Sequence, residues 1–181
     1  MKKHDFSSRG IIILCCLGLL ILCAIAAAIF RASPRRTYEL SNKSVCQSRL
    51  HQIGLGILLY SFDNGGSYPD SFASLILAEK MEPCVFVCPG SNDNPSTAPT
   101  TRAQADEMSS PGHVSYIYLG KGLTSKTVLS NQIIAYEPLA NHGDGIDVLF
   151  GDGHAEFFDL KRATKIISDA NAGIRPVMVP P

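Results

Sequence analysis

The chain has 181 residues and carries 16 basic and 16 acidic side chains, so its formal net charge at pH 7 is zero. This length is enough for one domain with accessory segments. Its basic residues form no stripe and do not alternate with aromatic residues, and this pattern excludes nucleic acid as an expected partner.

The N-terminal region predicts a membrane anchor. Residues 1–9 form a short polar tail, and residues 10–30 follow as 21 residues without a charge, which is long enough to span a bilayer. A cleaved signal peptide is the alternative, because residues 26–28 are three alanines, but its apolar core would measure only about 7–15 residues. We therefore expect a transmembrane helix at 10–30 and a linker at 31–40, where Pro34 interrupts or kinks a helix.

An amphipathic helix is expected next, beginning near residues 40–42. Its apolar residues recur at steps of four and three, which places them on one stripe of an α-helix. The stripe consists of Cys46, Leu50, Ile53, Ile57 and Tyr60. Near its C-terminal end the stripe is expected to widen through Leu58, Leu59 and Phe62. Gly54 and Gly56 lower helix propensity by up to ~1 kcal/mol each, so we expect them to permit close approach of a neighbouring element. Residues 63–66 end the helix.

The remaining elements are short and predict an α+β head domain over residues 41–173. They are a helix at 71–80, strands at 85–87, 114–119 and 132–136, a β-hairpin at 141–160 and a helix at 161–170. This order predicts a small, mostly antiparallel sheet with helices packed on it. Residues 90–112 are polar and form a long surface loop. Residues 174–181 are expected to be a C-terminal tail.

The hairpin is predicted from apolar and polar side chains that alternate on both strands. The dipeptide Asp152-Gly153 favours a two-residue type I′ turn, in which both central residues have φ > 0. That turn sets two cross-strand pairs on one apolar face, Phe150 with Ala155 and Val148 with Phe157. Phe158 then falls on the opposite face, which must also be partly covered.

Acidic and imidazole side chains gather in and around this hairpin: His142, Asp144, Asp147, Asp152 and His154. In the structural interpretation, Asp152 accepts hydrogen bonds from turn amides and Gly153 supplies the turn conformation. His142 then holds the approach loop, the polar residues 141–144 that lead into the hairpin, in place by a hydrogen bond. In a second interpretation, Asp144, Asp147 and Asp152 bind Ca²⁺ with backbone carbonyls, because Ca²⁺ takes 6–8 oxygen ligands. A transition-metal site that includes a histidine is the third.

A metal-dependent hydrolase is a further alternative, with His142, Asp152 and His154 as ligands. A catalytic zinc site needs about three protein ligands and an open position, but a hairpin tip offers no cleft. The chain also lacks a Gly-x-Ser-x-Gly motif, a phosphate loop and a His-Glu-x-x-His motif. We therefore expect that the protein is not an enzyme.

Four sequence blocks occur in an order that resembles a known family. They are CQSRLHQIGLGILLYSFDNGGSYPDS at 46–71, Phe-Val-Cys-Pro at 86–89, Ser-Tyr at 115–116, and His142 followed after nine residues by Asp152-Gly153. Together they resemble the prepilin-type, pseudopilin-like bacterial family with a C-terminal His-x9-Asp-Gly signature, numerous in planctomycetes and similar to type II secretion pseudopilins. In that family His142, Asp152 and Gly153 would be the signature residues.

The resemblance implies a single-pass protein of the inner membrane, with its N-terminus in the cytoplasm and its head in the periplasm. It also implies a Cys46–Cys88 disulfide, because both cysteines match family positions, and this leaves Cys84 over. Gly10 corresponds to the prepilin processing site. However, the fifth residue after Gly10 is Cys15, where a prepilin has the Glu used in assembly. A permanently anchored chain that keeps only the head is therefore the alternative to a processed filament subunit.

These observations predict a membrane-anchored structural or interaction protein. The expected role is a minor subunit of a type II secretion or type IV pilus-like assembly, with the membrane and other pseudopilin or secretion-system proteins as partners. The alternative is a membrane-anchored binding module that forms no filament and captures calcium or another ligand with residues 90–112 and the acidic hairpin tip. The first role needs no cofactor, and Ca²⁺ is the expected cofactor of the second.

Overall fold

The computed structural model describes residues 8–32 and 34–180, without the side chains of residues 8, 9, 11, 29–32 and 34–39. The chain divides into two compact units, Met1–Leu40 and Ser41–Pro181. We call the second unit the head.

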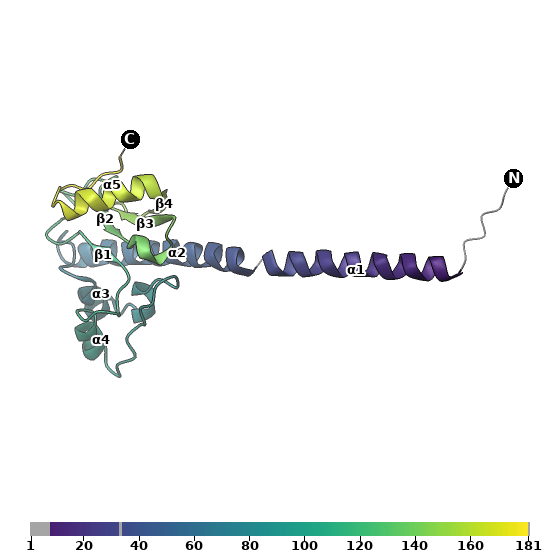
Figure 1. Ribbon diagram of the computed structural model, residues 1–181. Coiled ribbons are helices and arrows are strands. Elements are labelled where there is room, and N and C mark those ends of the chain that lie inside the picture. Colours follow the sequence, from purple (N-terminus) through teal and green to yellow (C-terminus); the bar gives the residue numbers. More distant parts are fainter. Residues whose placement is uncertain (1–7, 33, 181) are drawn as a thin grey trace. The chain divides into compact units, whose positions relative to one another are not determined.

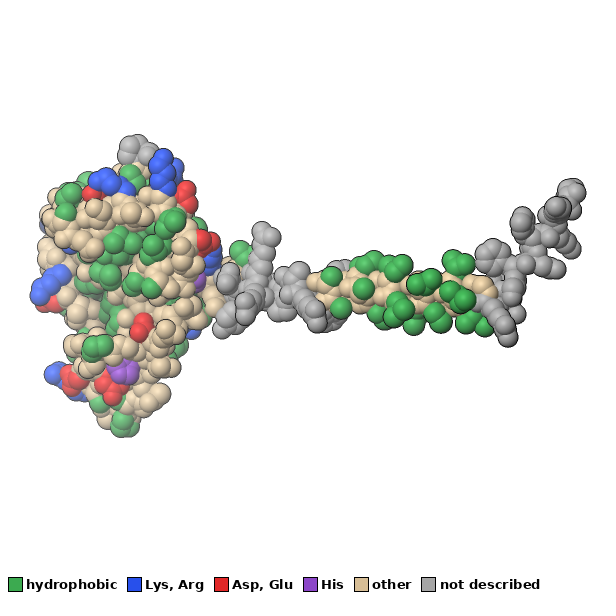
Figure 2. Space-filling model, viewed as in Figure 1, with side chains coloured by type: hydrophobic (Ala, Val, Ile, Leu, Met, Phe, Trp, Pro, Cys, Tyr) green, Lys and Arg blue, Asp and Glu red, His purple; other side chains and the backbone are tan. Residues whose placement is uncertain are grey.

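The first unit contains α1, Ser8–Ala32, drawn in purple in Figure 1. The helix covers the predicted span 10–30, and Figure 2 shows hydrophobic side chains along its described part. Among the described residues, however, no helix has both the length and the apolarity needed to cross a membrane. The side chains of Ile11, Ile29 and Phe30, which belong to the predicted span, lie outside the described part.

The next helix, α2, spans Pro34–Asp63 and therefore begins at the residue predicted to interrupt a helix. Proline is tolerated in a first turn because the backbone N–H it lacks has no intrahelical partner there. Residues 31–40, predicted as a linker, are thus largely helical, and no new helix begins at 40–42.

The head consists of one sheet between two helical layers (Figure 1). The strands are β1 (Ile117–Tyr118), β2 (Ile133–Tyr136), β3 (Gly145–Phe150) and β4 (Ala155–Asp159). They form an antiparallel sheet in the order β1-β2-β3-β4. The head part of α2 packs on one face, and α5, Leu160–Asn171, packs on the other. The predicted α+β class is confirmed.

Short helices complete the head. They are α3 (Phe72–Glu79), the 3₁₀ helix η1 (Pro83–Phe86), α4 (Thr101–Glu107) and the 3₁₀ helix η2 (Leu139–Asn141). The helices predicted at 71–80 and 161–170 are confirmed, but the strand predicted at 85–87 is wrong. Pro83 stands at the first position of η1, where a fixed φ suits a helical turn, and a run of three apolar residues cannot distinguish the two states.

The predicted loop at 90–112 contains α4. Thr100 caps this helix, because its hydroxyl accepts a hydrogen bond from the amide of Ala103 at 3.2 Å. Within α4 only Ala105 is buried, so its residues carry no apolar stripe from which a helix could be predicted.

The predicted stripe of α2 is confirmed as the centre of the core. Its first four members have no exposed surface: Cys46, Leu50, Ile53 and Ile57. The predicted widening of this stripe is wrong. Leu58 is 37% exposed, Leu59 is 51% exposed and Phe62 is 84% exposed. Leu59 and Phe62 lie on the side of the helix opposite the stripe, at a rotation of about 100° per residue.

Gly54 allows α2 to touch the hairpin tip, as predicted. A Cβ atom at Gly54 would lie 2.8 Å from the carbonyl oxygen of Gly153 and 2.7 Å from Cδ1 of Leu149. Two donors flank the contact. His51 Nδ1 lies 2.9 Å from the carbonyl oxygen of Gly153, and the side chain of Gln47 donates to Ala155 at 3.1 Å. The helix therefore meets β4 and its turn by backbone proximity and by hydrogen bonds.

The hairpin is confirmed, but its predicted register is off by one residue. Phe150 pairs with His154 through a 2.9 Å hydrogen bond, and the three residues between them form the loop. Gly153 has φ of +88°, and no non-glycine residue of the described hairpin has a positive φ. A three-residue loop that ends in a left-handed glycine replaces the predicted type I′ turn.

This shift changes which face each β4 residue occupies. Phe157 pairs with Asp147, whereas Phe158 pairs with Ile146 and joins the cluster under α5. Val148, predicted opposite Phe157, lies opposite Glu156 instead.

The predicted C-terminal tail is partly packed. Val177 is buried in the cluster beneath α5, and its carbonyl accepts a 2.9 Å hydrogen bond from the amide of Ile133. Gln132 and Met178 form an isolated antiparallel bridge. These contacts place part of the segment beside the start of β2.

Gly54→Ala is expected to lower the free energy of unfolding of the head by about 1–3 kcal/mol, because the new methyl group meets backbone atoms that cannot move aside. This loss occurs although alanine favours a helix by ~1 kcal/mol. Denaturant unfolding measures the effect.

Gly56→Ala is the matched control in the same helix. Its Cβ would meet Sδ of Met81, which lies in a flexible side chain that can move aside, so the expected loss is below about 1 kcal/mol. A Gly54→Ala variant as stable as Gly56→Ala would contradict the close backbone contact.

Candidate functional site

A buried disulfide joins α2 to the segment that follows η1. Cys46 and Cys88 are bonded, their Cα atoms lie 5.2 Å apart, and 42 positions separate them in sequence. The pairing implied by the family resemblance is thus present, and Cys84 is a free, exposed thiol. Closing a loop of this length typically stabilises a fold by about 2–4 kcal/mol.

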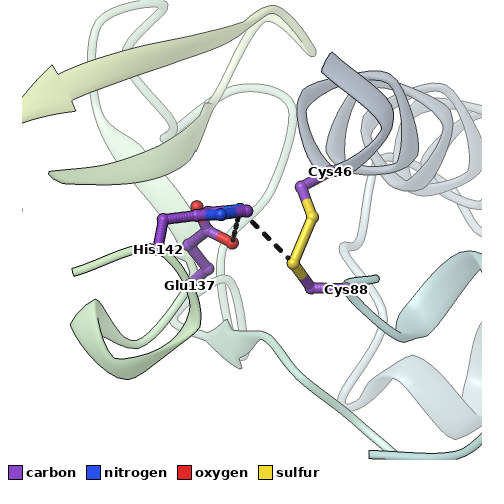
Figure 3. A group of neighbouring side chains, drawn as sticks. All are labelled: Cys46, Cys88, Glu137 and His142. Carbon is purple, nitrogen blue, oxygen red and sulfur yellow. Dashed lines mark hydrogen bonds and ion pairs between the residues drawn. A yellow bond between two sulfur atoms is a disulfide. The ribbon is translucent and has the colours of Figure 1, made fainter. Parts of the chain in front are cut away.

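His142 lies between this disulfide and a buried carboxyl group (Figure 3). Its Nε2 is 3.4 Å from Sγ of Cys88 and also 3.4 Å from Oε2 of Glu137. The His142 side chain is only 3% exposed. His142 therefore fixes the approach loop to the disulfide, whereas the predicted structural role did not specify its partner.

Glu137 follows β2 directly and is fully buried. Its Oε1 accepts a 2.9 Å hydrogen bond from the amide of Asp147, and its own amide donates to the carbonyl of Asp147 at 3.1 Å. Its Oε2 also accepts from the side chain of Asn141 at 3.5 Å. The sequence offered one signal for this residue, an acidic side chain placed between a strand of apolar residues and Pro138, but that pattern identifies no partner.

Glu137 and Asp147 form a buried carboxyl pair. Burial raises the pKa of Glu137, and the neighbouring Asp147 charge raises it further. Burial also raises the pKa of Asp147, while a hydrogen bond with Glu137 and the nearby Lys43 charge lower it. Glu137 is therefore the partner that holds a proton more firmly. The state in which only one of the two carboxyl groups is ionised is favoured over the state in which both are ionised.

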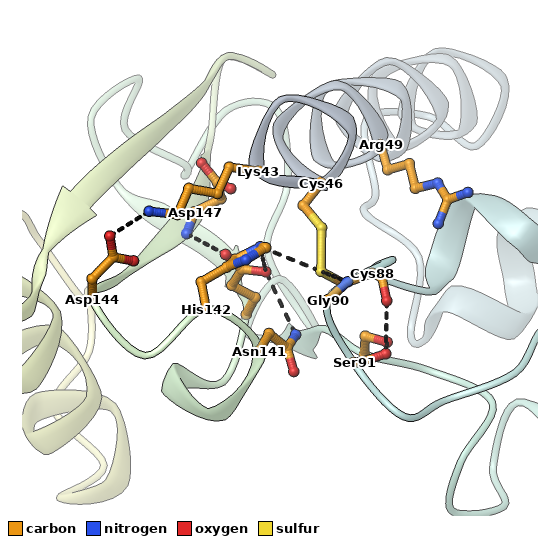
Figure 4. A network of polar contacts seen from close by, with 12 residues as sticks. Lys43, Cys46, Arg49, Cys88, Gly90, Ser91, Asn141, His142, Asp144 and Asp147 are labelled. Carbon is orange, nitrogen blue, oxygen red and sulfur yellow. Dashed lines mark hydrogen bonds and ion pairs between the residues drawn. A yellow bond between two sulfur atoms is a disulfide. The ribbon is translucent and has the colours of Figure 1, made fainter. Parts of the chain in front are cut away.

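Lys43 lies near Asp147 and reaches Asp144 in the approach loop (Figure 4). Its ammonium group makes an ion pair with Asp144, whose side chain is 62% exposed. Lys43 also lies 4.7 Å from the ring centroid of Phe157. Asp144 thus serves a surface contact, while Asp147 is buried beneath it.

Asp152 and Gly153 behave as the structural interpretation predicts. Asp152 Oδ1 accepts a 3.1 Å hydrogen bond from the amide of His154 and also pairs with its imidazole. Although burial alone raises the pKa of Asp152, these hydrogen bonds bring it below its usual range. The ring of His154 stacks on Phe150 at a centroid distance of 4.2 Å.

The predicted metal-ligand sets are not brought together. Among the described residues, the group whose ligand atoms all lie within 4.8 Å consists of Cys46, Cys88, Glu137 and His142. Asp144, Asp147 and Asp152, predicted for Ca²⁺, do not form such a group, because they occupy the approach loop, a buried strand position and the turn. His142, Asp152 and His154 likewise form no such group among the described residues, since His142 contacts Cys88 whereas Asp152 and His154 pair at the turn.

A second polar feature lies near residues 90–112. A hollow of about 330 Å³ is lined from this segment by Met108 and Ser109, and by residues of α3 and β1. Tyr116 and Tyr118 also line it, and their hydroxyl groups are buried and have no hydrogen-bond partner in the described part of the chain. Burial raises the pKa of both phenols well above the usual range.

Comparison of the chain with models of protein families, with curated proteins and with solved structures finds no match.

The carboxyl pair is expected to make the head less stable as the pH rises. Because the folded state raises the pKa of Glu137, its stabilising protonated form is fully present below the ordinary carboxyl pKa and is lost as the pH rises through the folded value. We expect the free energy of unfolding to fall by about 1–3 kcal/mol between about pH 5 and about pH 8. Urea unfolding at several pH values measures it.

Glu137→Gln removes the titrating group and should flatten this dependence. Glu156→Gln is the control, because Glu156 is exposed on β4, and it should keep the wild-type slope. An unchanged slope in Glu137→Gln would contradict the assignment of the dependence to the pair.

Proposed function

We propose that this chain is a membrane-anchored, pseudopilin-like structural protein whose head packs against other subunits of a type II secretion or type IV pilus-like assembly. The anchor is residues 10–30, and the head lies on the outer side of the inner membrane. The proposal draws its family from the ordered sequence blocks and its architecture from the helix α2 on a small antiparallel sheet.

The observation that carries the proposal is an apolar row on the uncovered side of α2. Leu55 is 54% exposed, Leu59 is 51% exposed and Phe62 is 84% exposed. Their spacing of four and three residues places them on one side of the helix, opposite the buried stripe. A helix with apolar residues on both sides is expected to be buried on both sides. The sheet covers only one of them.

A hollow adjoins this row and enlarges the available surface. It measures about 420 Å³ and is lined by Leu58, Phe62 and the glycines that end α2, together with Ser125 and Lys126. Large apolar side chains of α1 are likewise exposed, Leu19 and Leu22 among them at 69% and 70%. Lipid and neighbouring helices are the two environments that cover apolar helix surface of this kind.

Site-specific photo-cross-linking in native membranes tests the proposal. A photoreactive phenylalanine analogue at position 62 of the full chain should cross-link to a second copy or to another subunit with an apolar N-terminal helix. Mass spectrometry of the cross-linked band identifies the partner.

The analogue at position 160 is the matched control, since Leu160 is 49% exposed but lies on α5, so no cross-link is expected there. Equal cross-linking from both positions, or none from position 62, would overturn the packing role. Recovery of the chain in carbonate-washed membranes tests the anchor separately.

A binding module is the second candidate function, and the hollow beside residues 90–112 favours it. Among the described residues, no group pairs with the buried hydroxyls of Tyr116 and Tyr118 in the wall of this hollow, so a small ligand that donates or accepts hydrogen bonds would satisfy them once a side-chain movement exposes them. The ring of Phe72 lies 5.0 Å from that of Tyr118 and gives the hollow an apolar wall.

Tyr116→Phe with Tyr118→Phe separates the two candidates. Removing unpaired buried hydroxyls should raise the free energy of unfolding by about 1 kcal/mol, and it should abolish binding of any ligand held by them. Ligand-observed NMR with a set of small hydrogen-bonding compounds measures binding to the full chain and to the variant. Compounds that bind both equally, or none that bind the wild type, would remove this candidate.

A further inference from the structure

The residues around the disulfide have the composition of a metal-ligand set. Two cysteine sulfurs, one imidazole nitrogen and one carboxylate oxygen lie within 4.8 Å of one another. They come from α2, from the segment after η1, from the residue after β2 and from the approach loop of β3. All four side chains are buried or nearly so.

The two distances from the His142 imidazole to its neighbours suit a tetrahedral ion. Zinc binds thiolate sulfur at about 2.3 Å and nitrogen or oxygen at about 2.0–2.2 Å, so tetrahedral ligand atoms lie roughly 3.3–3.8 Å apart. His142 Nε2 lies 3.4 Å from Sγ of Cys88 and 3.4 Å from Oε2 of Glu137. Zinc binding further requires that the disulfide is broken, that the two sulfurs separate and that the remaining ligand atoms, which lie within 4.8 Å of one another, adjust to the ion.

Hydrogen bonds already orient the set as they orient ligands in metal sites. The backbone amide of Asp147 holds Oε1 of Glu137 at 2.9 Å, which leaves Oε2 directed at His142. The amide of Gly90 donates to Sγ of Cys88 at 3.3 Å. A side chain at Gly90 would also crowd the imidazole, since its Cβ would lie 2.9 Å from Cε1 of His142.

We propose that the reduced chain binds one Zn²⁺ through Cys46, Cys88, His142 and Glu137, and that formation of the disulfide releases it. With four protein ligands and no open position, the site is structural. The metal would connect the same segments that the disulfide connects, in a chain whose cysteines have not yet been oxidised. The inference is independent of the proposed assembly role.

The exchange balances in atoms and electrons. When Zn²⁺ binds, the two thiols release two protons to solvent and the protonated carboxyl of Glu137 releases a third, which returns to Glu137 when the ion leaves. The oxidant is a disulfide-carrying partner, which undergoes thiol–disulfide exchange. The sulfur–sulfur bond of Cys46 and Cys88 forms as the partner's bond breaks. Two electrons pass to the partner's sulfurs, which take up two protons, and Zn²⁺ leaves.

Metal titration of the full chain in detergent tests the proposal. The protein is reduced with a phosphine, freed of metal and titrated with Zn²⁺, and with Co²⁺ as a spectroscopic probe. One ion per reduced chain is expected, with the visible absorption of tetrahedral cobalt–thiolate coordination, and none for the oxidised chain. Absence of stoichiometric metal in the reduced chain overturns the proposal, whether or not that chain stays folded.

Substitutions distinguish Zn²⁺ binding at the four-residue site from Zn²⁺ binding by cysteine thiols alone. Cys46→Ser with Cys88→Ser keeps the other four cysteines and should bind no stoichiometric metal. His142→Ala and Glu137→Gln should each weaken Zn²⁺ binding by more than about tenfold, whereas His51→Ala, outside the set, should leave it unchanged. Unchanged affinity in both ligand variants contradicts the four-residue site.

Oxidation gives a second readout. Adding a disulfide oxidant to the zinc-loaded chain should release one Zn²⁺ to a chromogenic chelator as the disulfide forms. Metal retained after the disulfide has formed would refute the exchange.

Discussion

The contact between the backbones of α2 and the hairpin tip determines how the head is assembled. It requires a glycine at position 54, because any Cβ there meets the carbonyl of Gly153 at 2.8 Å. The Cys46–Cys88 disulfide fixes the same helix eight residues earlier, which is roughly 12 Å along its axis. With the helix held at two points, its buried stripe can only face the sheet.

This arrangement gives the spacing of His142 and Asp152-Gly153 a physical meaning. His142 contacts the disulfide at one end of the helix segment, and Gly153 contacts Gly54 at the other. The nine residues between His142 and Asp152 contain β3, which is six residues long and extends over roughly 17–20 Å. The interval therefore contains one strand, whose two ends lead to the two contacts.

The sequence predicted those elements whose structure is set by the periodicity of their apolar residues. It did not predict the features that are set by tertiary contacts. The stripe from Cys46 to Ile57 was predictable because four residues share one helical phase. The hairpin register was not, because Asp152-Gly153 fits both a two-residue and a three-residue loop, and the docking of Gly153 on α2 selects the second. Glu137 was missed because its importance lies in Asp147 and His142, which reach it only in the folded chain.

Packing alone does not account for the polar groups at the centre of this head. Burying the carboxyls of Glu137 and Asp147 disfavours their charged forms, and apolar residues of similar volume often serve a core equally well or better. A disulfide needs no carboxyl or imidazole beside it, yet both are aimed at its sulfurs or at each other. Imidazole nitrogen and carboxylate oxygen are, however, common zinc ligands. Under the zinc proposal, the same four residues would provide two alternative links between the same segments, a disulfide and a metal ion.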